Sequence, residues 1–270
     1  MKEIYNELTA DFENYLKKNQ IVDEVSAIHE SDEYDKKIKF SKSKNNIVVL
    51  GLNPSGSKKN EEINDDGFLH YMPPGLILDE HISAFIKMKG VGRKLFYDQY
   101  FKKPHDLFFE HNYVPYWMNP VIGEDLIKEK VRIGRLHLNE GEILERYLDI
   151  YNKHRYLYFN DLIPIRITNS WHLKHYFKTI NNSLKESFIK ERISYLISVY
   201  NPKLILINNA FVSDLISNTR FEKEYNGITY KIINNETTVV FSSIMSNGNL
   251  DKYSEQRLKN EVKLLLLNTD

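Results

Sequence analysis

Cysteine is absent from the 270 residues of this chain. Its absence excludes disulfide bridges, zinc sites built on thiolates, iron–sulfur clusters and a thiol nucleophile. The formal net charge is zero, so no global positive field draws the protein toward nucleic acid, and any such binding must depend on local patches. No apolar run reaches the roughly 18 residues that a membrane-spanning helix needs. We therefore expect a protein without disulfides and without a membrane partner.

The remaining composition is that of an ordinary globular protein. Hydrophobic residues make up 41% of the chain and charged residues 27%, both near the average for folded domains. Residues 1–20 have the mixed pattern of an amphipathic helix and lack the apolar region of a cleavable signal. We expect a cytoplasmic protein with a single domain over residues 1–270, in which 1–45 form an N-terminal helical extension and 69–155 a helical insertion.

Segments with strand character alternate with segments of helical character. Buried strands are predicted at 46–52, 156–167, 202–208 and, as two runs around a turn at Asn234 and Asn235, within 228–247. Helices are predicted at 1–20, 184–201, 210–218 and 251–268, with a helical hairpin at 76–101. Right-handed crossovers between such elements predict the α/β class, with three α/β/α layers around a mostly parallel sheet of four to five strands.

Three of the predicted strands end in polar turns. Residues 51–57 follow the first strand, Asn160 and Asp161 lie inside or at the end of the second, and residues 246–249 follow the last. Ligands of open α/β sheets bind beyond the carboxyl ends of the strands. We therefore expect the three turns to meet at one crevice.

The same three segments resemble, in this order, motifs of the uracil-DNA glycosylase superfamily. They read GLNPSGS at 51–57, YFNDLIPIR at 158–166 and FSSIMSNGNLDKYSEQRL at 241–258, and the likeness covers about 47–262. It is nearest to the mismatch-specific and single-strand-selective branches, which carry Asn-Pro in the first motif. The resemblance implies a uracil-DNA glycosylase-like fold with a DNA partner, no metal and no cofactor.

The activity implied by the resemblance is that of a monofunctional DNA glycosylase. Such an enzyme flips a deaminated or modified pyrimidine out of the stack and hydrolyses its N-glycosidic bond, which leaves an abasic site. The biological setting would be base-excision DNA repair or antiviral defence against phage DNA with modified bases.

The resemblance also implies roles for individual residues. Asn53 would position the attacking water, Asn160 would read the edge of the flipped base, and Leu250 would fill the gap that the base leaves. Contacts with the base and its pocket would come from Gly51, Leu52, Pro54, Ser55, Phe68, Tyr71, Asn160 and Asp161. Contacts with the DNA backbone would come from Ser57, Lys58, Gly90, Gly92, Arg93, Lys94, Arg166, Ser246, Gly248, Asn249 and Leu250.

The last motif departs from the family pattern because Met245 stands where the family has a histidine. Asn247 or Asn249 would replace the aid that this histidine gives to the leaving base. Asp161 is also unusual, and its carboxylate would accept a hydrogen bond from an exocyclic amino group, which favours a cytosine-like or modified base over uracil.

Other interpretations stay open at this stage. The segment FIKMKGVGRKLF at 85–96 resembles a helix-hairpin-helix whose backbone amides hold a phosphate, and it equally fits a plain helix connector. His105, His111, His172 and His175 lack the carboxylate pattern of a metal site. The alternative functions are a catalytically inactive glycosylase fold that binds DNA or a protein, and a nucleotide-binding regulator.

Overall fold

The computed structural model describes residues 1–21, 45–53, 101–115, 141–142, 145–146, 149–150, 153, 155–165, 167, 169–225, 227, 229–234, 236–245 and 250–267. Within these ranges the chain forms one six-stranded sheet and six helices. The predicted hairpin at 76–101 and most of the insertion at 69–155 lie outside the described residues.

The sheet is mostly parallel, as the sequence predicts. Its strands are β1 (Asn46–Gly51), β2 (Val114–Pro115), β3 (Tyr156–Asp161), β4 (Pro202–Ile207), β5 (Tyr230–Ile233) and β6 (Thr237–Val240), in the order β2-β3-β1-β4-β6-β5. Neighbouring strands run parallel except β5, which pairs antiparallel with β6. The expected count of four to five strands is too low, because the two-residue strand β2 is too short to produce a sequence pattern.

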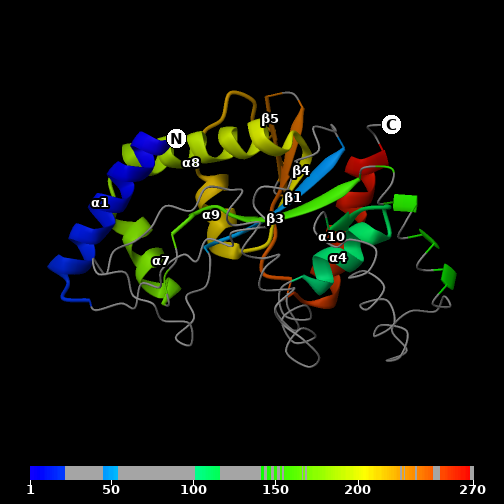
Figure 1. Cartoon of the computed structure of the whole chain (residues 1–270), viewed down its shortest axis with the longest axis horizontal. Coiled ribbons are helices and arrows are strands. Elements are labelled where there is room, and N and C mark those ends of the chain that lie inside the picture. Colours follow the sequence, from blue (N-terminus) through cyan, green and yellow to red (C-terminus); the bar gives the residue numbers. More distant parts are fainter. Residues whose placement is uncertain are drawn as a thin grey trace, which may run out of the picture.

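Helices cover both faces of this sheet. They are α1 (Lys2–Lys18), α4 (Lys102–Phe109), α7 (Ser170–Thr179), α8 (Asn182–Tyr200), α9 (Ala210–Ser217) and α10 (Lys252–Leu267). Figure 1 shows α1, α7, α8 and α9 on one side of the sheet and α4 and α10 on the other. An ion pair of 3.1 Å between Lys103 and Glu255 links α4 to α10. In the described part of the chain, every helix is too short or too polar to span a bilayer.

Side chains of β3 alternate between the two helical layers, as the pleat of a strand requires. Tyr158 packs on Tyr200 of α8 with ring centroids 4.7 Å apart. Phe159 points the other way and meets Phe101 at the start of α4, with centroids 4.7 Å apart. Asp161 therefore shares the α4 side of the strand, and Asn160 shares the α8 side.

A single residue joins α8 to β4. The helix ends at Tyr200 and the strand begins at Pro202, so Asn201 makes the whole turn in the left-handed conformation, with φ 44°. Asparagine tolerates this conformation better than most residues. The side chain of Asn46 in β1 donates a hydrogen bond of 2.8 Å to the carbonyl oxygen of Tyr200, which fixes the end of α8 against the sheet.

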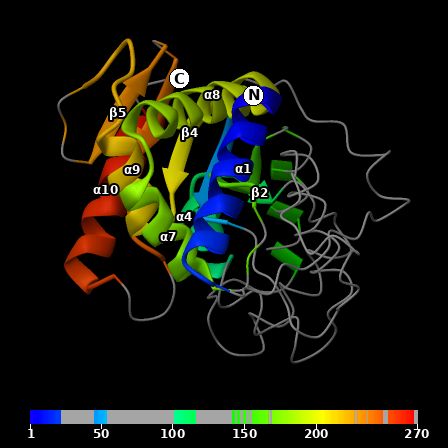
Figure 2. The same ribbon diagram turned by 90° about the vertical axis from the view of Figure 1, so that its left-hand side faces the viewer.

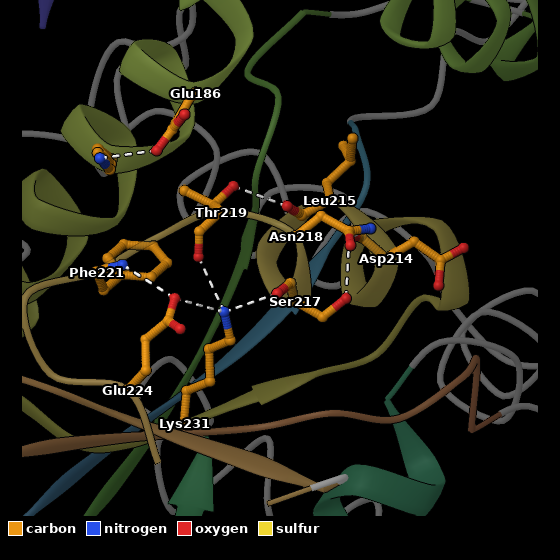
Figure 3. Close-up of polar contacts among 10 residues, drawn as sticks. Glu186, Asp214, Leu215, Ser217, Asn218, Thr219, Phe221, Glu224 and Lys231 are labelled. Atoms are coloured by element: carbon orange, nitrogen blue, oxygen red, sulfur yellow. Dashed lines mark hydrogen bonds and ion pairs between the residues drawn. The ribbon is translucent and has the colours of Figure 1, made fainter. Parts of the chain in front are cut away.

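The edge strand β5 is tied to the end of α9 by a buried lysine (Figure 3). The Nζ atom of Lys231 donates to the carbonyl oxygens of Ser217 and Thr219 at 2.7 and 2.9 Å, and it pairs with Glu224 at 3.1 Å. A cation at the C-terminal end of a helix binds carbonyl groups that lack a partner within the helix. Lys231 therefore fastens the antiparallel hairpin to the helical layer.

Candidate active site

The ends of β1 and β3 lie side by side at the carboxyl edge of the sheet. Gly51 pairs with Asp161 in the last step of the ladder. Beyond it, the amide of Leu162 donates to the carbonyl of Gly51 at 3.0 Å, and that of Ile163 to the carbonyl of Leu52 at 2.9 Å. The first two polar turns therefore begin in contact with each other, as the sequence predicts.

The third segment approaches the same edge through β4. The amide of Asn208, just past β4, donates to the carbonyl of Leu50 at 2.8 Å. The side-chain oxygen of Asn208 accepts a hydrogen bond of 2.7 Å from the amide of Met245. This pair of bonds places the chain that follows β6 next to the end of β1, so the described parts of all three segments meet.

Gly51 leaves room for the carboxylate of Asp161. A Cβ atom at position 51 would collide with Oδ1 of Asp161. The absence of a side chain therefore lets the carboxyl group of Asp161 lie directly over the end of β1. Only 6% of Asp161 is exposed.

Burial makes this carboxyl group unusual. It raises the pKa of Asp161 from an ordinary value of 3.8 to about 7, and the nearby Arg192 guanidinium opposes the rise. Near neutral pH the group is therefore present in both protonation states. Carboxyl groups with this property at the end of parallel strands are suited to proton transfer.

A fully buried arginine holds the end of β3 in place. Nε of Arg192 donates to the carbonyl of Leu162 at 3.0 Å, and Nη2 donates to Oδ1 of Asn160 and to the carbonyl of Asp161 at 2.9 and 2.6 Å. Oδ1 of Asn160 also accepts from the amide of Asp161 at 2.9 Å, and its Nδ2 donates to the Tyr200 hydroxyl at 2.8 Å. The Asn160 side chain thus belongs to a network on the α8 side.

Arg192 is not among the site residues predicted from the sequence, although its position within an apolar helical stripe could have identified it. In α8 the buried apolar residues Phe188, Ile189, Ile193 and Leu196 surround this position, so the arginine falls within the apolar stripe of the helix. A charged residue there is rarely buried without specific hydrogen-bond acceptors, and here these acceptors belong to the strand that carries Asp161.

The other predicted site residues lie as follows. Asn53 is partly exposed two positions after Gly51, Leu52 is buried, and Leu250 is half-buried against the hydrophobic core. Several predicted residues lie outside the described part of the chain, namely Pro54, Ser55, Ser57, Lys58, Phe68, Tyr71, Gly90, Gly92, Arg93, Lys94, Arg166, Ser246, Asn247, Gly248 and Asn249. Among the residues that are described, no three imidazole or carboxylate groups gather to hold a metal ion.

A groove of about 580 Å³ lies away from this edge. Its lining consists of Lys190, Ser194, Arg220, Phe221, Glu222, Ile233 and Asn234. Ile233 pairs with Thr237 at the start of β6, so this end of the groove belongs to the amino edge of the parallel strands. Lys190 is already paired with Glu186 at 2.8 Å. The groove contains none of the predicted site residues, and the buried acid makes the carboxyl edge the better candidate.

Replacing Gly51 by alanine is expected to lower the stability of the protein. The new Cβ would push the Asp161 carboxylate aside, at a cost of about 1–3 kcal/mol in the free energy of unfolding. Gly227→Ala is a matched control, because a Cβ there meets its neighbours at ordinary distances of 3.4–3.5 Å. Chemical denaturation measures both variants. In an Asp161→Ala background the penalty at position 51 should shrink, and an undiminished penalty there would argue against this packing.

The protein is thus of the α/β class, with a buried carboxyl group of raised pKa at the carboxyl ends of two central parallel strands. Comparison with protein-family models gives no match, and comparisons with curated proteins and with solved structures give none either.

Proposed function

We propose that the protein is a monofunctional DNA glycosylase acting on a flipped-out deaminated or modified pyrimidine. The observation that supports this function best is the position of the Asp161 carboxyl group over Gly51, at the start of the turn that carries Asn53. An acid and a carboxamide at adjoining strand ends provide the two groups that a hydrolytic reaction at C1′ needs, one to move a proton and one to position water.

At C1′ the proposed reaction breaks one bond and forms one bond, and two proton transfers accompany these changes. The bond between C1′ and the pyrimidine N1 breaks, and both of its electrons leave with the base. Water held by the Asn53 side chain attacks C1′ and gives a proton to the ionised carboxylate of Asp161. The base anion then takes a proton from solvent. Because the transition state is cation-like at the sugar, the ionised carboxylate also stabilises its charge.

The network around Asn160 favours a second candidate function. Its carboxamide already bonds to Arg192 and Tyr200 on the α8 side, which leaves it less able to read the edge of a base. A fold with Asn160 in a structural role also fits an inactive glycosylase-like module that binds DNA without releasing a base.

Asn53→Ala is expected to lower base release by about 100-fold or more while the melting temperature and the affinity for DNA stay near those of the wild type. Asn53 is a partly exposed turn residue, so its truncation removes the water-positioning amide without opening the core. Asn218→Ala is the control, since Asn218 is an exposed amide at the end of α9. Unchanged base release in the Asn53 variant would remove this residue from the mechanism.

The assay that separates enzyme from binder uses oligonucleotides with uracil, mismatched thymine or modified cytosines. Alkali treatment cuts the strand wherever a base has been released. We expect alkali-dependent cleavage and no cleavage without alkali, because the mechanism forms no covalent amine intermediate. Binding without release on every substrate would favour the inactive module.

A further inference from the structure

Helix α7 carries an exposed aromatic and basic stripe that the predicted site does not include. Its members are Trp171, Lys174, His175 and Lys178, which occur at the i, i+3, i+4 and i+7 positions of one helical face. Trp171 is 58% exposed, although an indole of this size is usually covered. On the opposite face, Leu173, Tyr176 and Phe177 are buried in the core. The stripe is therefore the outward face of α7.

The indole of Trp171 is held in a fixed orientation. The backbone amide of Trp171 donates a hydrogen bond of 3.0 Å to the side chain of Asn169, which caps the start of α7. Its ring stacks on His175, with centroids 5.2 Å apart and an interplanar angle of 27°, and it meets the edge of His172 at 5.2 Å. His175 is in turn fixed by a hydrogen bond of 2.6 Å between its Nδ1 and the Tyr15 hydroxyl of α1. One side of the indole is thus supported and the ring stays largely exposed.

The charged side chains of α7 itself are all positive. Residues 170–179 contain two lysines and no aspartate or glutamate. Two acids of α1 face the buried Tyr176 on the inner side of α7: Asp11 accepts a hydrogen bond of 2.8 Å from the Tyr176 hydroxyl, and the charge of Glu7 helps to raise the pKa of that hydroxyl. A rigid aromatic surface flanked by ammonium groups is the combination that binds a single nucleic-acid strand, because a base stacks on the ring while phosphates meet the cations.

The position of the stripe agrees with the site. In Figure 2 the arrow of β4 points toward the end of the molecule at which α7 lies. Since β1 and β3 run parallel to β4, their carboxyl ends point toward the same end of the molecule as α7.

From these observations we infer that Trp171 is a stacking platform for an unpaired base of the DNA strand, with Lys174 and Lys178 bound to its phosphates. The inference rests on the proposed function for the identity of the nucleic acid as DNA. Its chemistry needs neither base release nor the Asp161 carboxyl group, so binding and catalysis can be tested apart.

The test measures binding of the whole protein to an undamaged, fluorescein-labelled single-stranded 12-mer of mixed sequence. We expect Trp171→Ala to weaken binding by about tenfold or more and Trp171→Phe to weaken it less, since a smaller ring still stacks. Lys174→Ala and Lys178→Ala should each reduce the slope of log affinity against log salt by about 0.7.

Tyr225→Ala is the matched control. Tyr225 is 53% exposed and stacks on Tyr230 of β5, with ring centroids 5.1 Å apart and an interplanar angle of 9°, so it resembles Trp171 in exposure and support. In contrast to Trp171, it follows a stretch with two acids and one lysine, Glu222, Lys223 and Glu224. Its removal should leave oligonucleotide binding unchanged. An equal loss in this variant, or no loss in Trp171→Ala, would overturn the platform.

Two further arms identify the ligand. An RNA 12-mer of the same sequence should bind no better than the DNA, and a preference for RNA would overturn the DNA assignment. The affinity for heparin should fall in the lysine variants and stay unchanged in Trp171→Ala, because heparin has charge and no bases. An equal fall in the tryptophan variant would mean that the effect of Trp171 on binding is electrostatic and not due to stacking. If the wild type releases bases and Trp171→Ala binds the oligonucleotide as tightly as the wild type does, the stacking platform is refuted and the proposed glycosylase function is not.

Discussion

Asp161→Asn is expected to stop base release and, at the same time, to make the protein more stable at pH 8. The variant keeps the size of the side chain and loses its ability to take a proton from water. Removal of a general base lowers rates by about 100- to 10,000-fold, and the alkali-cleavage assay would measure this fall. The stability gain has a separate origin in the burial of the carboxyl group.

The sign of the stability effect follows from the direction of the pKa shift. Burial raises the pKa of Asp161 from 3.8 to about 7, so the folded state binds the proton more tightly than the unfolded chain does. The stabilisation from this proton is complete below pH 4 and is lost as the pH rises to about 7. Above pH 7 the folded protein must hold a buried charge, at a cost of up to about 4 kcal/mol. Asparagine avoids this cost.

Chemical denaturation at pH 5 and pH 8 measures the difference. The wild type should lose stability between these values relative to the variant, and base release by the wild type should rise through the same range as the carboxylate forms. Asp214→Asn, on the exposed side of α9, is the control and should change neither property. A variant that releases bases at the wild-type rate would rule out Asp161 as the base.

The largest loss of stability is expected for Arg192→Met. The substitution preserves much of the side-chain volume but leaves the carbonyl oxygens of Leu162 and Asp161 and the side chain of Asn160 without their guanidinium donor. Breaking a buried charged network of this kind costs about 3–5 kcal/mol. Lys190→Met on the same helix is the control, because its ion pair with Glu186 is half exposed and should contribute less than about 1 kcal/mol.

Arg192→Lys tests whether the arginine also tunes the site. Lysine retains the charge but lacks the planar fork, so it cannot bond all three acceptors, and we expect an intermediate loss of stability. Because the guanidinium opposes the rise in the Asp161 pKa, the pH at which base release reaches half of its maximum should move upward in Arg192→Met and less in Arg192→Lys. Equal pH profiles in all three proteins would limit Arg192 to a purely structural role.

Asn160→Ala removes another member of the same hydrogen-bond network. The sequence motif alone suggests a base-reading residue whose truncation leaves folding intact, whereas the bonds to Arg192 and Tyr200 predict a measurable loss of stability. Since both substitutions remove one shared hydrogen bond, the combined loss in Arg192→Met with Asn160→Ala should be smaller than the sum of the single losses.

Much of the sheet was predictable because its signals are local. The aliphatic runs of β1 and β4 predict buried parallel strands, and the turn at Asn234 is confirmed by its φ of 51° between β5 and β6. Helix α7 was missed because only three of its ten residues are buried and its outward face is aromatic, which hides the usual contrast between apolar and polar faces. Its start depends on the Asn169 cap, a short-range feature that many turns share.

The arrangement of the site was predictable only in outline. The parallel sheet and its polar turns predict that the ends of β1 and β3 meet, and they do. Successive side chains of a strand face opposite helical layers, so a shift of the strand register by one residue would exchange the sides of Asn160 and Asp161. The sequence does not fix which of the two faces α8. The raised pKa of Asp161 depends on burial by distant parts of the chain, and no pattern within the motif itself encodes that burial.

The one-residue connection between α8 and β4 restricts how this protein can vary in length. Each residue of an α-helix turns the chain by about 100°, so an insertion absorbed by the end of α8 would swing the Arg192 side chain off the strand that it holds. Asn201 therefore serves as a fixed spacer that keeps helix rotation and strand register in phase. Extra residues are therefore expected to be better tolerated in connections that do not set the rotation of α8.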